Sequence, residues 1–261
     1  MDFAFATPTA SQATAERAAP PGPWSPPALR LVCLDIDDTL IDFTSAGSRA
    51  LAELIGRADM WSLWERITDE HVAKVVAGDL AYADMHLTRS RCFLAELGAE
   101  MDTGDVVGFE ARRRELLRRS WRLFDDVLPC LDWLNAAGVQ LAAVTNASGG
   151  HQRAKLADLG LARFFDHVAI AGEMGTAKPD PVMFHTVCLT MGCDPSEAAH
   201  VGDKLDTDAI GARDAGLGGV WLNRRAVTED VPTGVHEIDS LAELPELLIC
   251  EFASVGVPIQ R

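Results

Sequence analysis

The strongest constraint on the fold is a regular alternation of short apolar segments with longer amphipathic segments after residue 124. Strands are expected at 29–34, 139–144, 167–171, 198–201 and 219–222, and helices at 129–137, 150–159, 180–191, 206–215 and 240–252. Strands that alternate with helices pair in parallel, and strands that are apolar throughout fit burial on both faces. The pattern therefore predicts an α/β fold, with a Rossmann-like parallel sheet and helices on both faces.

A helical block interrupts this pattern directly after the first expected strand. Within residues 45–123, apolar side chains recur at spacings of three and four, and the segment is punctuated by Gly56, Gly78, Gly98 and Gly104. We expect an all-helical insertion there, and a sheet domain made of residues 29–44 and 124–252. The insertion lies at the carboxyl end of a strand, which is the edge where open α/β sheets bind ligands. Residues 1–28, rich in Ala and Pro, are expected to be a disordered arm, and residues 253–261 a tail.

Composition excludes several classes of protein. The chain carries 39 acidic and 23 basic residues, a formal net charge of −16, which disfavours binding to nucleic acids and to anionic membrane surfaces. It contains no apolar run of about 18 residues, so no membrane-spanning helix is expected, and its first residues do not resemble a secretory signal. The six scattered cysteines form no CxxC pair and are expected to be reduced thiols of a cytoplasmic protein, not zinc ligands.

Polar residues gather where the expected strands end. They are Asp35 and Asp37 after the first strand, Thr145 and Asn146 after the second, Lys178 after the third and its loop, and Asp203 after the fourth. The carboxyl ends of parallel strands share one edge, so these side chains should converge. Clustered carboxylates raise one another's pKa values unless a cation neutralises them. A few oxygen ligands that leave room for water and phosphate suit Mg²⁺, and a lysine and a threonine suit a phosphate group.

Four sequence motifs carry a resemblance to a known family. Asp-Ile-Asp-Asp-Thr-Leu, Val-Thr-Asn, Ala-Lys-Pro-Asp-Pro and Val-Gly-Asp-Lys-Leu-Asp-Thr-Asp follow one another in this order. Together they resemble the four motifs of the haloacid dehalogenase superfamily, over about residues 30–222, and the helical insertion resembles the cap of that superfamily. Within the superfamily, the stretches Thr-Leu-Ile-Asp and Ala-Lys-Pro-Asp-Pro look most like those of small-molecule phosphatases such as phosphoglycolate phosphatase, acylneuraminate-9-phosphatase and pyrimidine nucleotidase.

The resemblance implies a role for each carboxylate of the first motif. Asp35 would be the nucleophile that forms an aspartyl-phosphate. Asp37 would be the general acid that protonates the leaving oxygen and then the base that activates water. The Asp35 carboxylate, the backbone carbonyl of Asp37 and the side chain of Asp203 would hold Mg²⁺. Thr39 would fix the turn that carries Asp37.

The other motifs would supply the phosphate site. Thr145 and the backbone N–H of Asn146 would hold phosphoryl oxygens, and Lys178 would neutralise the charge on the nucleophile and the phosphoryl group. Asp208 would orient either metal-bound waters or Lys178. The resemblance thus implies a Mg²⁺-dependent phosphatase that hydrolyses a small phosphorylated metabolite, as a monomer or homodimer.

Three alternatives use the same fold: a phosphomutase, a 2-haloacid dehalogenase and a non-catalytic binding protein. Asp37 argues against a dehalogenase, because departure of a halide requires no protonated leaving group. Specificity is expected to reside in the cap and its loops, with Phe43, Arg49 and the turns near Gly78 and Gly104 as candidates. The basic run at residues 111–120 is expected chiefly to form a solvated helix face, with contact to a substrate phosphate as the alternative.

Overall fold

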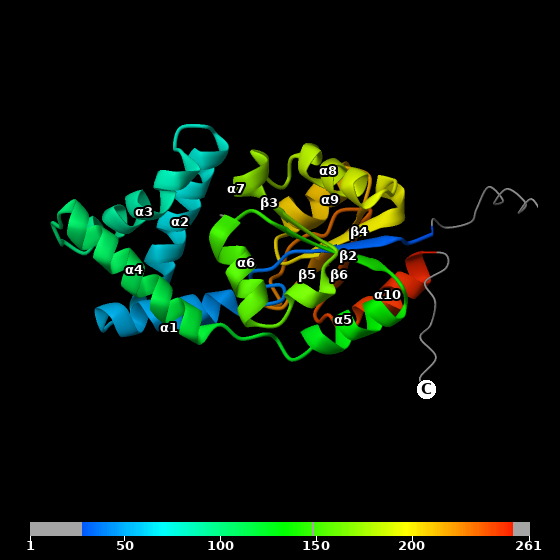
Figure 1. Ribbon diagram of the computed structural model, residues 1–261, viewed down its shortest axis with the longest axis horizontal. Helices are drawn as coiled ribbons and strands as arrows, with labels where there is room; N and C mark the ends of the chain where they lie inside the picture. Colours follow the sequence, from blue (N-terminus) through cyan, green and yellow to red (C-terminus); the bar gives the residue numbers. More distant parts are fainter. Residues whose placement is uncertain (1–27, 148, 253–261) are drawn as a thin grey trace, which may run out of the picture.

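The computed structural model describes residues 28–147 and 149–252. The expected tail at 253–261 and the expected arm at 1–28, except Ala28, lie outside the described residues. A parallel sheet flanked by helices forms one end of the molecule and a group of four long helices forms the other (Figure 1). Among the described residues, no helix is long and apolar enough to cross a lipid bilayer.

A single six-stranded sheet, parallel throughout, has the strand order β3-β2-β1-β4-β5-β6. The strands are β1 (Leu31–Leu34), β2 (Gln140–Thr145), β3 (His167–Ile170), β4 (Ala198–Gly202), β5 (Gly218–Leu222) and β6 (Val235–Ile238). Because β1 lies between β2 and β4, the residues that follow it reach the middle of the sheet edge. The predicted Rossmann-like parallel sheet is confirmed.

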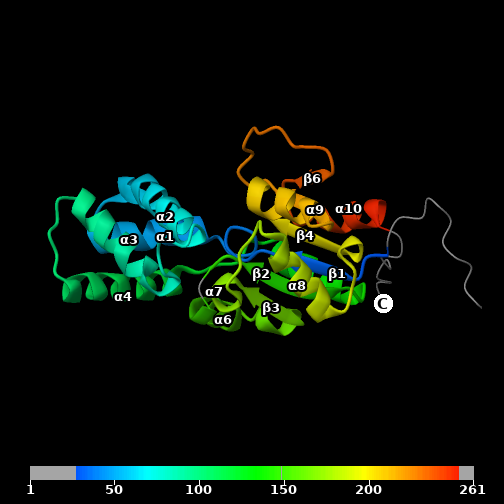
Figure 2. The same ribbon diagram turned by 90° about the horizontal axis from the view of Figure 1, so that it is seen from above.

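Helices cover both faces of the sheet, above and below it in the view of Figure 1, and Figure 2 looks onto one of these faces. Along β1, Leu31 and Cys33 pack with α8 (Pro181–Met191) and with residues of α9 (Gly211–Asp214). Val32 and Leu34 point to the other face, into the cluster that includes residues of α5 (Val127–Ala136), α6 (Gly149–Asp158) and α10 (Leu244–Glu251). Burial on both faces explains why the central strands are apolar at every position.

Three local features differ from the sequence prediction. The strand β6 was not expected: it is an edge strand that pairs only with β5, and its two middle residues are polar, so it forms no apolar run. Ala171, expected to end a strand, begins the short helix α7 (Ala171–Met174). The expected helix at 206–215 is a π-helical turn, η4 (Leu205–Ile210), followed by α9. Short 3₁₀ turns complete the core at η2 (Ala162–Phe164) and η3 (Pro195–Glu197).

The four long helices form a block with its own core. They are α1 (Phe43–Ile55), α2 (Trp61–Val76), α3 (Tyr82–Glu96) and α4 (Thr103–Ser120), with η1 (Ala58–Met60) before α2. Side chains from all four meet in one apolar cluster that includes Leu51, Trp64, Phe93 and Val106. Asp42 and Asp102 begin α1 and α4 by accepting backbone N–H groups, which is why these helices start where they do.

The two chain segments that join the helical block to the sheet domain run antiparallel to each other. Ile41 pairs with Leu123 in an isolated bridge, and the amide of Asp42 donates to the carbonyl of Arg122 at 3.0 Å. The chain therefore leaves and re-enters the sheet domain at neighbouring points, beside the residues that follow β1. A cavity of about 800 Å³ lies between the block and the sheet edge and is lined by residues of both.

Candidate active site

The chain turns sharply directly after β1. The amide of Asp35 still donates to Val201 of β4 at 2.9 Å, but the amides of Leu40 and Ile41 both donate to the carbonyl of Ile36, at 3.0 and 3.1 Å. Asp38 has a φ of 59°, a left-handed conformation that aspartate tolerates better than most residues. This turn carries Asp37 off the line of the strand while Asp35 stays at its end.

The turn is not held by the hydroxyl of Thr39. That hydroxyl is buried and has no hydrogen-bond partner among the described residues. Instead, Arg224 donates to the carbonyl of Thr39 at 2.9 Å, and its guanidinium is fixed by two 2.8 Å hydrogen bonds to Asp126. The expectation that Thr39 fixes the turn therefore finds no support in side-chain hydrogen bonding; the support comes from an arginine that follows β5.

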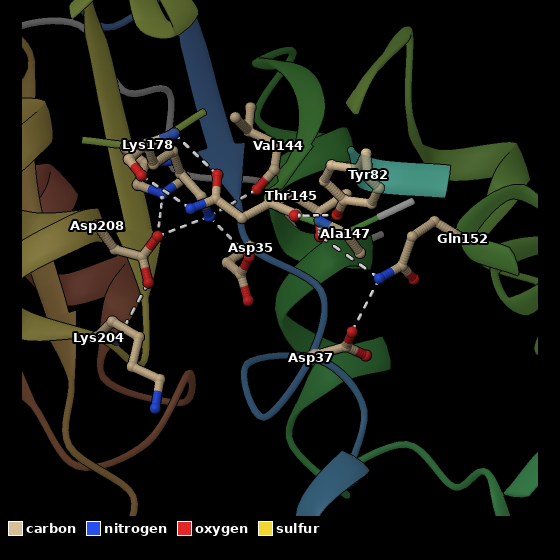
Figure 3. A network of polar contacts seen from close by, with 12 residues as sticks. Asp35, Asp37, Tyr82, Val144, Thr145, Ala147, Gln152, Lys178, Lys204 and Asp208 are labelled. Carbon is tan, nitrogen blue, oxygen red and sulfur yellow. Dashed lines mark hydrogen bonds and ion pairs between the residues drawn. The ribbon is translucent and has the colours of Figure 1, made fainter. Parts of the chain in front are cut away.

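Lys178 joins two carboxylates at the sheet edge (Figure 3). Its ammonium lies 2.7 Å from Asp35 and 2.6 Å from Asp208, and it donates to the carbonyl of Val144 at 2.8 Å. Although burial disfavours the charge of a lysine that is 3% exposed, Asp208 and Asp35 outweigh that effect and hold the pKa of Lys178 above its ordinary value. Three predicted residues, from sequence positions far apart, thus meet as a buried ion-paired group.

Asp203 completes an acidic cluster with Asp35 and Asp208. One carboxylate oxygen from each of the three lies within 4.8 Å of the other two. Burial, and then the charge of Asp35, raise the pKa of Asp203 to about 8. Burial also raises the pKa of Asp35 to about 7, even though the nearby Lys178 acts in the opposite direction. Without a cation, the buried setting therefore disfavours the charged forms of Asp35 and Asp203.

Clustered carboxyl groups, whose charged forms a cation would stabilise, are hard oxygen donors that fit a small divalent cation such as Mg²⁺. The three carboxylates do not have equal freedom to bind it, because Asp208 also accepts from the amide of Lys204 at 3.0 Å and contacts His200 at 3.1 Å. A Cβ on Gly202 would lie 2.3 Å from the carboxyl carbon of Asp208, so only glycine leaves room for that side chain. The residues of this cluster that remain available to a cation are Asp35 and Asp203.

The two predicted phosphate-binding residues lie at the same edge. The side chain of Asn146 donates to the carbonyl of Lys178 and accepts from its amide, both at 2.8 Å, which fixes the loop that carries Lys178. The hydroxyl of Thr145 accepts from the amide of Ala147 at 3.3 Å. Tyr82 of α3 donates to the carbonyl of Asn146 at 2.5 Å and so ties the helical block to this loop.

Two residues of α6 that the sequence analysis did not single out hold Asp37. Gln152 donates to one carboxylate oxygen of Asp37 at 2.8 Å, and the ammonium of Lys155 forms an ion pair with the other. Lys155 is buried, and its ammonium lies 4.5 Å from the centre of the Phe43 ring. The one sequence signal that could have pointed to Lys155 was composition, because Lys155 is one of only four lysines in the chain. A lysine in the middle of an amphipathic helix otherwise reads as a surface residue.

The cavity between the sheet edge and the helical block contains most of these groups. From the sheet side it is lined by Asp35, Asp37, Thr145, Asn146, Lys178 and Asp203, and from the block by Phe43, Tyr82, Met85, His86, Arg89, Arg113, Arg114 and Arg118. Of the expected specificity candidates, Phe43 lines this cavity, whereas Arg49 and the two glycines that mark the expected turns, Gly78 and Gly104, are exposed and lie outside its lining. The arrangement brings an anion-rich centre and a cationic wall into one space.

The basic run of α4 is more than a solvated face. The side chain of Arg112 is 52% exposed, as expected for such a face, but that of Arg113 is only 9% exposed. Glu110, also buried, accepts from Arg113 at 2.8 Å, from Arg114 at 2.9 Å and from Arg89 at 3.4 Å. Two arginines of the basic run thus bind a single buried carboxylate of the same helix.

Replacing Glu110 with glutamine is expected to lower the free energy of unfolding by about 3–5 kcal/mol at neutral pH, because it leaves buried guanidinium groups without their counter-charge. Although burial acts against it, the arginines hold the pKa of Glu110 well below its ordinary 4.5. The contribution is therefore complete above about pH 4.5 and fades as the pH falls below it. Urea unfolding of both proteins at several pH values measures this. Glu115→Gln, at an exposed ion pair, should cost less than about 1 kcal/mol; equal losses in the two variants would contradict the assignment.

Comparison with known proteins identifies the family. A family model described as haloacid dehalogenase-like hydrolase matches residues 29–216. The chain is 35% identical to phosphoserine phosphatase of Thermus thermophilus, over 69% of this chain and 70% of that protein. It is 29% identical to N-acylneuraminate-9-phosphatase of Homo sapiens, over 84% of this chain and 94% of that protein.

Comparison with solved structures points to the same family. The putative HAD-hydrolase YfnB of Bacillus subtilis, in a structure bound to magnesium, superimposes with a TM-score of 0.72 at 26% identity, covering 85% of this chain and 99% of that one. A 2-haloacid dehalogenase from Pseudomonas syringae superimposes with a TM-score of 0.61 at 26% identity, covering 84% and 98%. The resemblance drawn from the four motifs is confirmed: this chain belongs to the haloacid dehalogenase-like hydrolase family.

Proposed function

We propose that this protein is a Mg²⁺-dependent phosphatase that hydrolyses the phosphomonoester of a small metabolite through an aspartyl-phosphate on Asp35. The observation that carries the proposal is the 2.7 Å contact between the buried ammonium of Lys178 and the Asp35 carboxylate, in a cavity that Asp37 also lines. The relatives named as phosphatases support the reaction, and the free cysteines fit the expected reducing cytoplasm.

In the first step, one oxygen of Asp35 attacks phosphorus and the ester P–O bond breaks. Asp37, protonated, gives its proton to the departing oxygen and becomes a carboxylate. Lys178 offsets negative charge on the nucleophile and on the phosphoryl group as they approach. Thr145 and the amide of Asn146, at the end of β2, would donate to the phosphoryl oxygens.

In the second step, the Asp37 carboxylate takes a proton from water as that water attacks the aspartyl-phosphate. The bond between phosphorus and Asp35 breaks, inorganic phosphate leaves, and Asp35 is again a carboxylate while Asp37 is again protonated. Both steps require Asp37 to keep one orientation relative to Asp35. Its hydrogen bond to Gln152 and, whenever Asp37 is a carboxylate, its ion pair with Lys155 would maintain that orientation.

Asp35, Asp203 and the backbone carbonyl of Asp37 would hold the Mg²⁺. When bound, the ion supplies positive charge that reduces repulsion between the acidic cluster and an incoming phosphate. Asp208 contacts Lys178, His200 and the amide of Lys204. We therefore assign Asp208 to positioning Lys178, which is one of the two roles considered from the sequence.

The function is tested by measuring phosphate and halide release with the same purified protein. We expect inorganic phosphate from p-nitrophenyl phosphate and no chloride from 2-chloropropionate, because Asp37 is held in a position that only an oxygen leaving group needs. Chloride release without phosphate release would overturn the proposal in favour of a dehalogenase. Phosphate transfer to a second substrate, in place of release to water, would indicate a phosphomutase.

Lys178→Arg is expected to lower kcat/KM for p-nitrophenyl phosphate at least about tenfold, or about 1.4 kcal/mol. A planar guanidinium cannot occupy the point between Asp35, Asp208 and the Val144 carbonyl that a compact ammonium occupies. Steady-state kinetics measure the effect. Lys74→Arg, at an exposed position of α2, is the matched control and should leave kcat/KM unchanged. Equal kinetics for the two variants would remove Lys178 from the proposed mechanism.

A further inference from the structure

The wall that α3 and α4 contribute to the cavity carries an unusual concentration of arginines. We call Arg89, Arg113 and Arg114 the arginine cluster; all three line the cavity and all three surround Glu110. The proposed phosphatase mechanism makes no use of them. Three guanidinium groups against one buried carboxylate leave an excess of positive charge, which is costly unless another anion shares the space.

The hydrogen bonds of the cluster are also incomplete. Arg89 is 5% exposed, yet its Nε–H has no partner among the described residues, and its contact with Glu110 is long at 3.4 Å. Arg113 uses two N–H groups on Glu110 and Arg114 uses one, although each guanidinium offers five. A buried donor without an acceptor destabilises the folded protein. The cluster therefore has donors that could bind an acceptor from outside the described chain.

Burial and the neighbouring guanidinium groups together lower the pKa values of titratable groups at this wall. Burial, and then the adjacent Arg113, lower the pKa of Arg89 to about 9. Burial, followed by Arg89, lowers the pKa of His86 to about 4, and burial, followed by Arg114, lowers that of His151. Three acidic side chains that line the cavity already have cationic partners: Asp37 is paired with Lys155, Asp35 with Lys178, and Glu115 with arginines on the outer face of α4.

The positions of two members are fixed by packing. The guanidinium groups of Arg89 and Arg113 lie 4.3 and 4.8 Å from the centre of the Trp64 ring. Such stacking holds a guanidinium in place without using its in-plane donors. Arg114, with a 36% exposed side chain, is the member that a solvent-borne ligand reaches most easily.

We propose that the arginine cluster is a second anion-binding subsite, and that the substrate is a small phosphomonoester carrying another anionic group, a carboxylate or a second phosphate. This inference rests on the proposed phosphatase function and narrows its substrate class. The transferred phosphate would lie at Asp35 and Lys178, and the second anion would accept hydrogen bonds from Arg114 and from the free donors of Arg89. Such charge-assisted, bidentate contacts select for charge at the far end of the substrate.

The test compares substrates that differ in one anionic group. The pairs are glycerol 3-phosphate with 3-phosphoglycerate, and fructose 6-phosphate with fructose 1,6-bisphosphate. For the wild-type protein we expect kcat/KM to be at least about tenfold higher, in at least one pair, for the member that carries the additional anionic group. Arg114→Gln should reduce that ratio by about tenfold, whereas Arg112→Gln, at an exposed position of the same helix, should preserve it. Thermal unfolding verifies that both variants are folded.

Each outcome decides a separate question. A preference within the first pair alone identifies a carboxylate subsite, and a preference within the second pair alone identifies a phosphate subsite. Phosphate release from all four compounds, with no preference or with a preference unchanged by Arg114→Gln, overturns the subsite but leaves the phosphatase function standing. No release from these compounds or from p-nitrophenyl phosphate overturns the phosphatase function itself. Calorimetric binding of the same pairs to the Asp35→Asn variant gives a readout of the subsite that does not depend on turnover.

Discussion

Replacing Asp35 with asparagine is expected to reduce hydrolysis of p-nitrophenyl phosphate at least about a thousandfold, or about 4 kcal/mol. An amide oxygen is a much weaker nucleophile than a carboxylate and cannot form the same acyl-phosphate. The substitution would also leave the ammonium of Lys178, now 2.7 Å from the Asp35 carboxylate, with Asp208 as its remaining carboxylate partner. Steady-state assays and intact-protein mass spectrometry together measure the effect: turnover should be lost, and no phosphorylated protein should accumulate.

The control for this variant is Asp206→Asn. Asp206 is exposed and belongs to the same acidic segment as Asp203 and Asp208, but it does not line the cavity that contains Asp35. It should retain wild-type kcat/KM. Circular dichroism and thermal unfolding check that both variants are folded. If Asp35→Asn kept more than about a tenth of the wild-type activity, another group would have to be the nucleophile.

Removing divalent cations with EDTA is expected to bring activity to background, and adding excess Mg²⁺ to restore it. Without a cation, Asp203 and Asp35 have pKa values raised to about 8 and about 7, chiefly by burial. Asp35 would therefore be partly protonated near neutral pH, and a protonated carboxyl group is a much weaker nucleophile than a carboxylate. Full activity in the chelator would contradict the metal assignment and would favour the metal-independent chemistry of a dehalogenase.

A stability measurement tests the same site without relying on turnover. A carboxyl group whose folded-state pKa is raised weakens the folded protein progressively as the pH rises from the unfolded value of 3.8 through the folded value. A bound cation removes that penalty. Mg²⁺ should therefore raise the unfolding temperature more at about pH 8 than at about pH 6. Asp203→Asn should remove most of this difference, and a shift in Tm that is the same at both pH values would contradict the assignment.

The core of the fold was predictable because its signals are local. Strands apolar at every position, separated by amphipathic helices, have few alternatives to a parallel sheet covered on both faces, and Leu31 and Val32 of β1 indeed pack on opposite sides. The edge strand β6 was missed because an edge strand needs no such pattern. The π-helical turn at η4 was also missed; there the amides of Asp208 and Ala209 both donate to the carbonyl of Lys204.

The candidate site was predictable in part for a related reason. The ends of parallel strands must share an edge, so Asp35 and Lys178 could be expected to meet, and the family resemblance added Asp208 as a residue that could orient Lys178. The structure brings Lys178 within hydrogen-bond distance of both carboxylates. Their chemical roles remain predictions. The support for Asp37 was not predictable, because Gln152 and Lys155 lie on a helix whose sequence indicates burial of one face but not the group that face meets.

The sequence by itself determined the sheet, the family and the acidic centre, because these follow from periodicity and from motifs in which each residue has a fixed place relative to a strand end. Only the tertiary structure decided which charges face one another across the cavity. The pairing of Lys155 with Asp37 joins residues 118 positions apart. The burial of the Arg113 side chain depends on packing among α2, α3 and α4. Such contacts are set by how helices pack in three dimensions, and no local pattern in the chain encodes that packing.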